Sequence, residues 1–359
     1  MRIGETEIWP PLLLAPMAGL THSALRTTIL HFGGVGLLST EMLAAARLPA
    51  ERAHHSPYLV RTPQESPLSY QLLLTDEKNI SRIFDALHRL QADVVDLNLG
   101  CPAPQVRRAG GGSSLMEVPE RVRRIVASAR KNTSLPLTAK IRLGETLDEE
   151  KLRNFCRMLA DEGIDMLTVH ARLRSEPFAR RPRWAWVAKV KRWVDIPVVA
   201  NGSIDSAASA RCCLEESGAD GLMIGRAAAR MPWIFATIAQ EVYGVEIPAP
   251  NVVLPRLYQD FVTALVQRFQ PDRRLGRLKE FTHHFAKNYF FGHHLAAKVQ
   301  ASYSLEEACK QAEAFFAVND PEGGGEVGSS LFAAKAAEAD YSTPNPDLGT
   351  FPSGAATSS

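Results

Sequence analysis

Residues 196–230 read IPVVANGSIDSAASARCCLEESGADGLMIGRAAAR. Two short apolar runs, Pro197–Ala200 and Gly221–Ile224, enclose an amphipathic pattern over Ser206–Glu216. Runs without polar interruptions are typical of strands that are covered on both faces, and a helix between two such strands indicates a right-handed parallel crossover. The segment therefore predicts a βαβ unit.

The same alternation extends through most of the chain. Further apolar runs, each expected to be a strand, are Leu12–Pro16, Gly36–Glu41, Leu68–Leu73, Val94–Leu99, Leu137–Leu143 and Met166–Arg172. Further helical patterns are Ser23–Phe32, Glu77–Gln91, Pro119–Lys131, Glu149–Glu162, Trp184–Trp193 and Pro232–Tyr243. Eight strands separated by helices predict an α/β fold, a (β/α)8 TIM barrel. A doubly wound open sheet is the rival architecture, but no GxGxxG follows the first strand.

Four regions follow from the pattern. Residues 1–243 carry the βα alternation, and residues 244–255 (GVEIPAPNVVLP) are Pro-rich and typical of a linker. Residues 256–318 return to helical spacing of apolar side chains, which predicts a small C-terminal helical domain. Residues 319–359 are rich in Gly, Ala, Ser and Pro, and we expect them to be disordered.

Composition excludes several classes of protein. The 359 residues are 45% hydrophobic and 22% charged, with a net charge of +2, so a polyanion partner would need a local basic patch. No apolar run approaches the 18 or so residues of a membrane span, and we do not expect the N-terminal segment to be a secretory signal. Five cysteines without CxxC spacing indicate free thiols rather than disulfides or a metal site. We expect a cytoplasmic protein.

Polar side chains gather where the strands end, which is the face on which barrels carry their active sites. The last two strands end in Asn201-Gly202-Ser203 and Gly225-Arg226. Glycines allow a close approach of backbone N–H groups to an anion, and loops after the seventh and eighth strands often bind phosphate. Each glycine alone fits a simple turn equally well, but the two together favour a phosphate site.

Lys140 and His170 are expected inside the same mouth. An ammonium group in a strand is costly unless an anionic group meets it, and a reduced flavin would be such a group. An internal ion pair with a carboxylate such as Glu41 is the alternative for Lys140. His170 is either a hydrogen-bonded core histidine or, beside Arg172, a ligand contact.

Cys101 is the candidate for chemistry. It lies between Gly100 and Pro102 in a loop, where a thiol is more accessible than in a strand. The Gly-rich stretch at residues 110–112 would permit a mobile lid. Most cysteines are small buried hydrophobic residues, and the residues alone favour catalysis by Cys101 only slightly over that role.

Taken together, these segments resemble the tRNA-dihydrouridine synthase family. The resemblance covers residues 3–243 in order and continues more loosely through GRLKEF at residues 276–281. The segments that carry it are APMAGLTHSALR (15–26), STEM (39–42), SYQL (69–72), DLNLGCPAPQVRRAGGGSSLM (96–116), TAKIRLG (138–144), TVHARLR (168–174), IPVVANGSI (196–204) and DGLMIGRAAARMPWIF (220–235).

The resemblance implies FMN at the barrel mouth, NADPH or NADH as reductant, and tRNA as substrate for a monomeric enzyme that needs no metal. Hydride would pass from reduced FMN to C6 of a flipped-out uridine, and Cys101 would protonate C5. The implied FMN-binding residues are Pro16, Met17, Ala18, Gln71, Lys140, His170, Asn201, Gly202, Ser203, Gly225 and Arg226. The resemblance also implies that the helical domain of residues 256–318 binds tRNA. The candidates for contacting tRNA are Asn98, Arg142, Arg172, Arg277 and Lys279.

Three places depart from the family pattern. One lies in the helical tail, where Thr282-His283-His284 replaces residues that are often more basic. Ser203 stands where the family usually has Asp, and Ala171 stands where Gly is common, which places the flavin contacts in doubt. Two rival functions remain. One is a dihydroorotate-dehydrogenase-like or dihydropyrimidine-dehydrogenase-like flavoprotein acting on a free base, which would not need the basic C-terminal helices. The other is a non-catalytic RNA-binding barrel, for which Cys101, Lys140 and His170 would have no use.

Overall fold

The computed structural model describes residues 1–52 and 56–320. Eight parallel strands lie in the order β3-β11-β10-β9-β8-β7-β6-β4, and a bridge between Leu13 and Leu37 brings the first strand beside the last. The strands are β3 (Leu12–Leu14), β4 (Leu38–Ser39), β6 (Leu68–Leu73), β7 (Val94–Asn98), β8 (Leu137–Arg142), β9 (Met166–His170), β10 (Val198–Asn201) and β11 (Gly221–Ile224). A short β5 (Leu43–Ala44) also pairs with β6. The predicted (β/α)8 barrel is confirmed.

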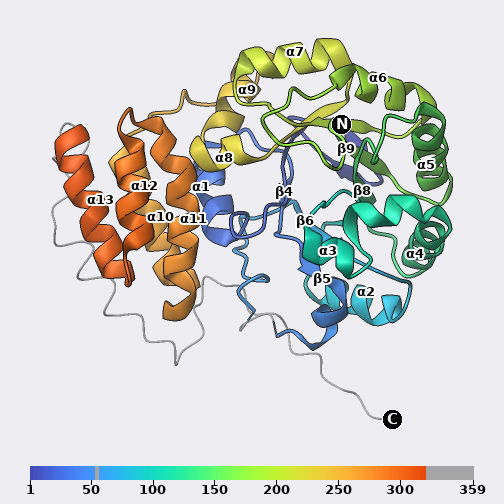
Figure 1. Ribbon diagram of the computed structural model, residues 1–359, viewed down its shortest axis with the longest axis horizontal. Helices are drawn as coiled ribbons and strands as arrows, with labels where there is room; N and C mark the ends of the chain where they lie inside the picture. The colour runs from blue at the N-terminus through green and yellow to red at the C-terminus, as the bar shows by residue number, and fades with distance from the viewer. Residues whose placement is uncertain (53–55, 321–359) are drawn as a thin grey trace.

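Helices between the strands cover the outside of the barrel (Figure 1). They are α1 (Ser23–Phe32), α2 (Ile80–Arg89), α4 (Pro119–Lys131), α5 (Glu149–Asp161), α6 (Trp184–Trp193), α7 (Ala207–Ser217) and α9 (Ile234–Tyr243). Helix α7 shows why the local sequence specifies these bounds. Ser206 and Ser209 form a capping box at its start, and Gly218 ends it with a left-handed φ of 58°.

A hairpin closes the N-terminal end of the barrel. Strands β1 (Arg2–Ile3) and β2 (Thr6–Glu7) pair antiparallel. Ile3 and Ile8 pack in one apolar cluster with Leu13, Val94 and Val199, which belong to the barrel strands β3, β7 and β10. Because this end is filled with side chains, the free end of the barrel is the one where the strands terminate.

The C-terminal helices pack against one side of the barrel, next to α1 and the short helix α8 (Arg226–Arg230) (Figure 1). They are α10 (Leu254–Arg268), α11 (Arg274–Phe285), α12 (Gly292–Ala301) and α13 (Leu305–Asn319), with the 3-10 turns η3 (Pro271–Arg273) and η4 (Ala286–Asn288). Stacked or tilted rings of Tyr258, Phe261, Phe281 and Phe285 fill their centre. One continuous apolar core includes both these rings and the barrel strands.

In the barrel the described chain also forms four short helical elements that periodicity did not predict: α3 (Pro104–Arg108), α8 (Arg226–Arg230) and the 3-10 turns η1 (Ala45–Ala50) and η2 (Gly112–Glu117). Each adjoins a strand end at the barrel mouth. None of the helices in the described part of the chain is long and apolar enough to cross a membrane. The expectation of disorder over residues 319–359 falls almost wholly on residues 321–359, which lie outside the described residues; at its first position it is wrong, because Asn319 is the last residue of α13.

Candidate functional site

A cavity of about 470 Å³ opens at the C-terminal mouth of the barrel. Of the predicted site residues, all lie in its wall except Arg277 and Lys279. Those in the wall are Pro16, Met17, Ala18, Gln71, Asn98, Cys101, Lys140, Arg142, His170, Arg172, Asn201, Gly202, Ser203, Gly225 and Arg226. Residues up to 210 apart in sequence thus meet because parallel strands end at one face.

A chain of hydrogen bonds runs from the barrel interior to the Cys101 loop. The Gln71 amide donates to Asp96 Oδ2 at 2.7 Å, and Gln71 Oε1 accepts from Asn98 Nδ2 at 2.8 Å. Asn98 Oδ1 in turn accepts the backbone N–H of Cys101 at 3.0 Å. Thr138 donates to the other oxygen of Asp96 at 2.6 Å, and burial raises the pKa of Asp96. Asn98 therefore fixes the loop that carries the thiol.

The half-buried Cys101 faces the cavity, and glycine packing supports its loop. The Ser113 N–H donates to the Cys101 carbonyl at 3.0 Å. Gly112 has a φ of +58°, and a Cβ there would lie 2.6 Å from that carbonyl oxygen. Gly112 thus packs tightly beneath Cys101, and Gly111 packs against Leu73, within the stretch that the sequence suggested as a mobile lid.

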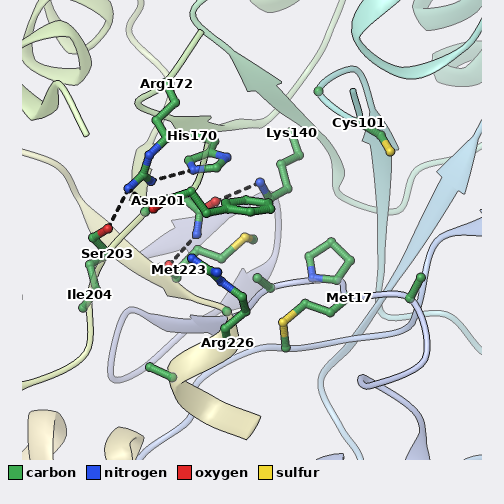
Figure 2. A pocket seen from close by; sticks show the side chains of 18 of the residues that line it. Met17, Cys101, Lys140, His170, Arg172, Asn201, Ser203, Ile204, Met223 and Arg226 are labelled. Atoms are coloured by element: carbon green, nitrogen blue, oxygen red, sulfur yellow. Dashed lines mark hydrogen bonds between the residues drawn. The ribbon is translucent and has the colours of Figure 1, made fainter. Parts of the chain in front are cut away.

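Lys140 is held by an amide rather than by a carboxylate. Its Nζ donates to Asn201 Oδ1 at 2.9 Å, and Asn201 Nδ2 donates to the Met223 carbonyl at 2.7 Å (Figure 2). Glu41, the alternative partner, instead accepts the Gly19 N–H at 2.6 Å. Burial lowers the pKa of Lys140 to about 8. The ammonium group thus faces the cavity without a fixed counter-charge from Glu41.

His170 and Arg172 form one unit. Arg172 Nη1 lies 3.0 Å from His170 Nε2, and because a guanidinium only donates, Nε2 accepts and the ring proton lies on Nδ1. Burial and then the neighbouring cations Lys140 and Arg142 lower the pKa of His170 far below its usual value. The ring is therefore neutral at pH 7.

Arg172 also anchors the loop that follows β9. Its guanidinium donates to the carbonyls of Arg180 and Phe178 and, at 2.7 Å, to Ser203 Oγ. Ser203 has a φ of +52°, a conformation that non-glycine residues adopt rarely, and this bond helps to hold it there. Arg142 donates to the Leu173 carbonyl at 2.8 Å, so both arginines have internal hydrogen-bond partners.

Phe178 is a site residue that the sequence did not reveal. Its ring stacks on His170 with centroids 5.9 Å apart, and the Arg226 guanidinium lies 4.4 Å from its centroid. Figure 2 shows His170 and Arg226 on the other side of Lys140 from Cys101. The ring is 50% exposed and lines the cavity. No periodicity or motif marks a single aromatic residue in an irregular loop.

The cavity is strongly cationic. Asp205 is the single acidic residue in the described wall. The lysines and arginines of the wall are Lys140, Arg142, Arg172, Arg226, Arg230 and Lys287. Apolar side chains such as Met17 and Met223 complete the lining. This combination suits a flat apolar ligand that carries a phosphate.

The C-terminal helices complete the wall with residues other than those predicted. His284 and Lys287 line the cavity, and burial lowers the pKa of His284 to about 4. Arg277 lies outside the wall, with its guanidinium 4.5 Å from the Phe269 ring centroid. Lys279 is half-buried on the same helix and also lies outside. Further wall residues that sequence reasoning missed are Met42, Met223, Arg230 and Met231. Among the described residues, no three His, Cys, Asp or Glu side chains cluster as a metal site would require.

Comparison with known proteins agrees with this geometry. The sequence model of the family described as dihydrouridine synthase matches residues 13–319. A "tRNA-dihydrouridine synthase B" of Xanthomonas axonopodis pv. citri is 35% identical over 263 residues, covering 71% of this chain and 77% of that protein. The protein of the same name from Escherichia coli strain K12 is 33% identical over 273 residues, covering 76% and 85%. A "Probable tRNA-dihydrouridine synthase 1" of Synechocystis sp. is 34% identical over 242 residues, covering 66% and 67%. The chain therefore belongs to the dihydrouridine synthase family.

Proposed function

We propose that the protein reduces specific uridines in tRNA to 5,6-dihydrouridine, with FMN as cofactor and NADPH or NADH as reductant. The observation that carries this proposal is that one cavity holds both the Cys101 thiol and a cationic wall of the kind that binds a phosphate group. The relatives named tRNA-dihydrouridine synthases support the substrate assignment. We also propose that the enzyme acts as a monomer and lies in the cytoplasm with tRNA.

The residues present fit a flavin phosphate. Gly202 has a φ of +120°, and a Cβ there would lie 2.8 Å from Arg172 Nη1 and 3.0 Å from His170 Cδ2. A glycine is therefore required to bring the backbone close to the cationic wall. We assign the phosphate and ribityl chain to Asn201, Gly202, Ser203, Gly225 and Arg226, and the ring system to Pro16, Met17, Ala18, Gln71, Lys140 and His170.

The flavin, when bound and reduced, supplies the hydride that reaches C6 of uridine. The protein supplies the proton, and we assign that role to the Cys101 thiol, which protonates C5. The hydrogen bonds from Asp96 through Gln71 and Asn98 hold the thiol's loop in place. The Lys140 ammonium group stabilises negative charge that develops in the cavity. For tRNA contacts we retain Asn98, Arg142, Arg172, Arg277 and Lys279, of which Arg277 and Lys279 lie outside the cavity wall.

Cys101→Ala separates the proton donor from the electron supply. We expect this variant to retain its flavin, to be reduced by NADPH at the wild-type rate, and to form dihydrouridine at least about 100-fold more slowly, because general acid catalysis typically contributes that much. Cys212→Ala, which removes an exposed thiol elsewhere, is the matched control and should match the wild type. Undiminished dihydrouridine formation by the Cys101→Ala enzyme would remove the assignment.

The substrate is tested with the unaltered protein. We expect NADPH oxidation to depend on unmodified tRNA and not on free uridine or dihydroorotate. Oxidation stimulated by a free pyrimidine and not by tRNA would favour the free-base reductase instead. Purified protein that binds no FMN would contradict both enzymatic functions.

A further inference from the structure

Two adjacent phenylalanines stand exposed beside the catalytic mouth. Phe290 is 92% exposed and Phe291 is 50% exposed, and their centroids lie 4.8 Å apart. The exposed His293 and His294 continue the group, with Phe291 and His294 centroids 6.4 Å apart and the two imidazoles 4.1 Å apart. We call these four residues the ring cluster. A buried phenylalanine stabilises a fold by about 1.5–3 kcal/mol, so leaving two in water requires another reason.

The backbone holds the two phenyl rings outward. Tyr289 turns inward, where its ring packs on Phe315 and its hydroxyl donates to Asp320 at 3.0 Å. The Gly292 N–H donates to the Tyr289 carbonyl at 3.2 Å, and a Cβ on Gly292 would lie 1.7 Å from the Ala286 carbonyl oxygen. Only glycine permits this tight turn, and the turn leaves residues 290 and 291 facing solvent. The backbone of the fold therefore fixes the exposure of Phe290 and Phe291.

The segment of chain that carries the ring cluster has positive charges and no negative ones. Residues 281–305 contain no aspartate or glutamate, but they contain Lys287 and Lys298, both exposed. An apolar patch for a protein partner or a second copy would need a broader aromatic and aliphatic area than these rings provide. Exposed aromatic faces among positive charges are instead typical of surfaces that bind unpaired nucleotides.

The ring cluster also lies close to the cavity. Lys287 lines the cavity wall, and Asn288 Nδ2 donates to the carbonyl of Arg230, another wall residue, at 2.7 Å. Phe290 follows two residues later, so its Cα lies within about 7.6 Å of that of Asn288. A nucleotide that enters the cavity therefore has neighbours within reach of the rings.

We infer that the ring cluster is a stacking surface for unpaired tRNA bases that flank the uridine in the cavity. This inference rests on the proposed function. It adds to that function by naming the part of the helical region that binds the substrate. Stacking on aromatic side chains contributes about 1–3 kcal/mol per base and tolerates any base. The rings thus strengthen binding without reading sequence.

Paired variants of Phe290 and Phe291 test the surface. With F290A/F291A we expect unmodified tRNA to bind about tenfold more weakly, and KM for tRNA to rise similarly, while flavin content and NADPH-driven flavin reduction stay unchanged. F290L/F291L keeps apolar bulk without an aromatic face and should lose as much. F290W/F291Y restores the faces and should bind within about twofold of the wild type.

Two controls separate stacking from other effects. Tyr303→Ala removes a ring that is 93% exposed at the far end of α12, about 15 Å along the helix axis, and should bind tRNA normally. Removing rings removes no charge, so the slope of log binding constant against log salt should be unchanged in F290A/F291A. Lys287→Ala should lower that slope by about one.

The outcomes are distinguishable. If wild-type protein neither binds tRNA nor makes dihydrouridine, the proposed function fails, and the ring cluster inference fails with it. If the wild type is active and F290A/F291A or F290L/F291L binds tRNA as tightly as it does, only the stacking inference is overturned. A change in oligomeric state or in binding to lipid vesicles, with tRNA affinity intact, would likewise overturn it.

Discussion

Lys140 shows how one residue serves binding at the expense of stability. Its ammonium group is held by the Asn201 amide, and burial lowers its pKa to about 8. In the unfolded chain its pKa returns to near 10.5, so between pH 8 and 10.5 the unfolded state binds a proton that the folded state lacks. The folding penalty from this group is therefore full below pH 8 and relieved as pH rises above it.

We expect Lys140→Met to stabilise the flavin-free protein at pH 7 by about 1 kcal/mol or more, since a buried charge is replaced by an apolar chain of similar length. The gain over the wild type should shrink between pH 8 and 10, as measured by urea unfolding. The same variant should retain flavin phosphate less well, as measured by the flavin-to-protein ratio. A gain that is equal at pH 7 and 9.5, or undiminished flavin content, would contradict this account.

At the scale of elements, the loop at residues 173–183 depends on Glu176. Its carboxylate accepts the Leu173 N–H at 2.9 Å and two N–H groups of Arg183 at 2.5 and 2.7 Å, and Arg180 lies 3.0 Å away. The Arg183 hydrogen bonds lower the pKa of Glu176 to about 2. This loop carries Phe178 over the cavity, so its stability bears on ligand retention.

Glu176→Gln should lower the free energy of unfolding by about 1–2 kcal/mol at pH 7, after allowance for solvent screening. Because the folded pKa is depressed, the contribution of Glu176 is fully present above about pH 4.5 and is lost as pH falls toward 2. The difference between variant and wild type in urea unfolding should thus narrow between pH 5.5 and 3.5. Glu306→Gln, which removes an exposed partner of Lys310, should change nothing measurable.

Strands and helices with strong patterns were predicted closely. The bounds of β6 and β11, and of α1, α4 and α6, agree with the structure at both ends. The apolar pattern of each of these elements lies entirely within the element, so the local sequence is sufficient to predict where it begins and ends. The helices α3 and α8 have only five residues each, and tertiary packing at the mouth rather than periodicity specifies such short pieces.

The sequence predicted which polar side chains gather in the site, but not which of them form hydrogen bonds with one another. Strand ends identified Gln71, Asn98 and Lys140, yet the link through Asp96 depends on strand register. The pairing of Gln71 with Asp96, and of Asp96 with Thr138, aligns these side chains across three strands. One sequence does not disclose that alignment, since a shift of one residue would point each side chain to the other face.

At the scale of the whole molecule, the barrel and the C-terminal helices share one core. His22, at the start of α1, is fully buried against the rings of Phe261 and Phe269, with centroids 5.9 and 5.3 Å away. Arg268 on α10 donates to Thr27 on α1 at 2.8 Å. Contacts of this kind join the interior of the barrel to that of the C-terminal helices, although the sequence of residues 244–255 between them is typical of a linker.

We expect a chain ending at residue 252 to fold poorly, because truncation exposes the apolar face of α1. It should lose cooperative thermal unfolding and bind a hydrophobic dye, whereas a chain ending at residue 320 keeps every contact described above and should unfold as the full chain does. A chain of residues 1–252 that unfolds cooperatively at the full-length temperature would show that the barrel is independent of the helices.

The hairpin formed by β1 and β2 has a kinetic consequence. Since it stops the opposite end of the barrel with Ile3 and Ile8, we expect the nicotinamide and the nucleobase of the proposed reaction to reach the cavity through the same opening, at the ends of the strands. We expect the two ligands to occupy the cavity in turn, each departing before the next arrives. Initial rates measured against both reactants should accordingly give parallel double-reciprocal lines, the pattern of an enzyme that alternates between two forms.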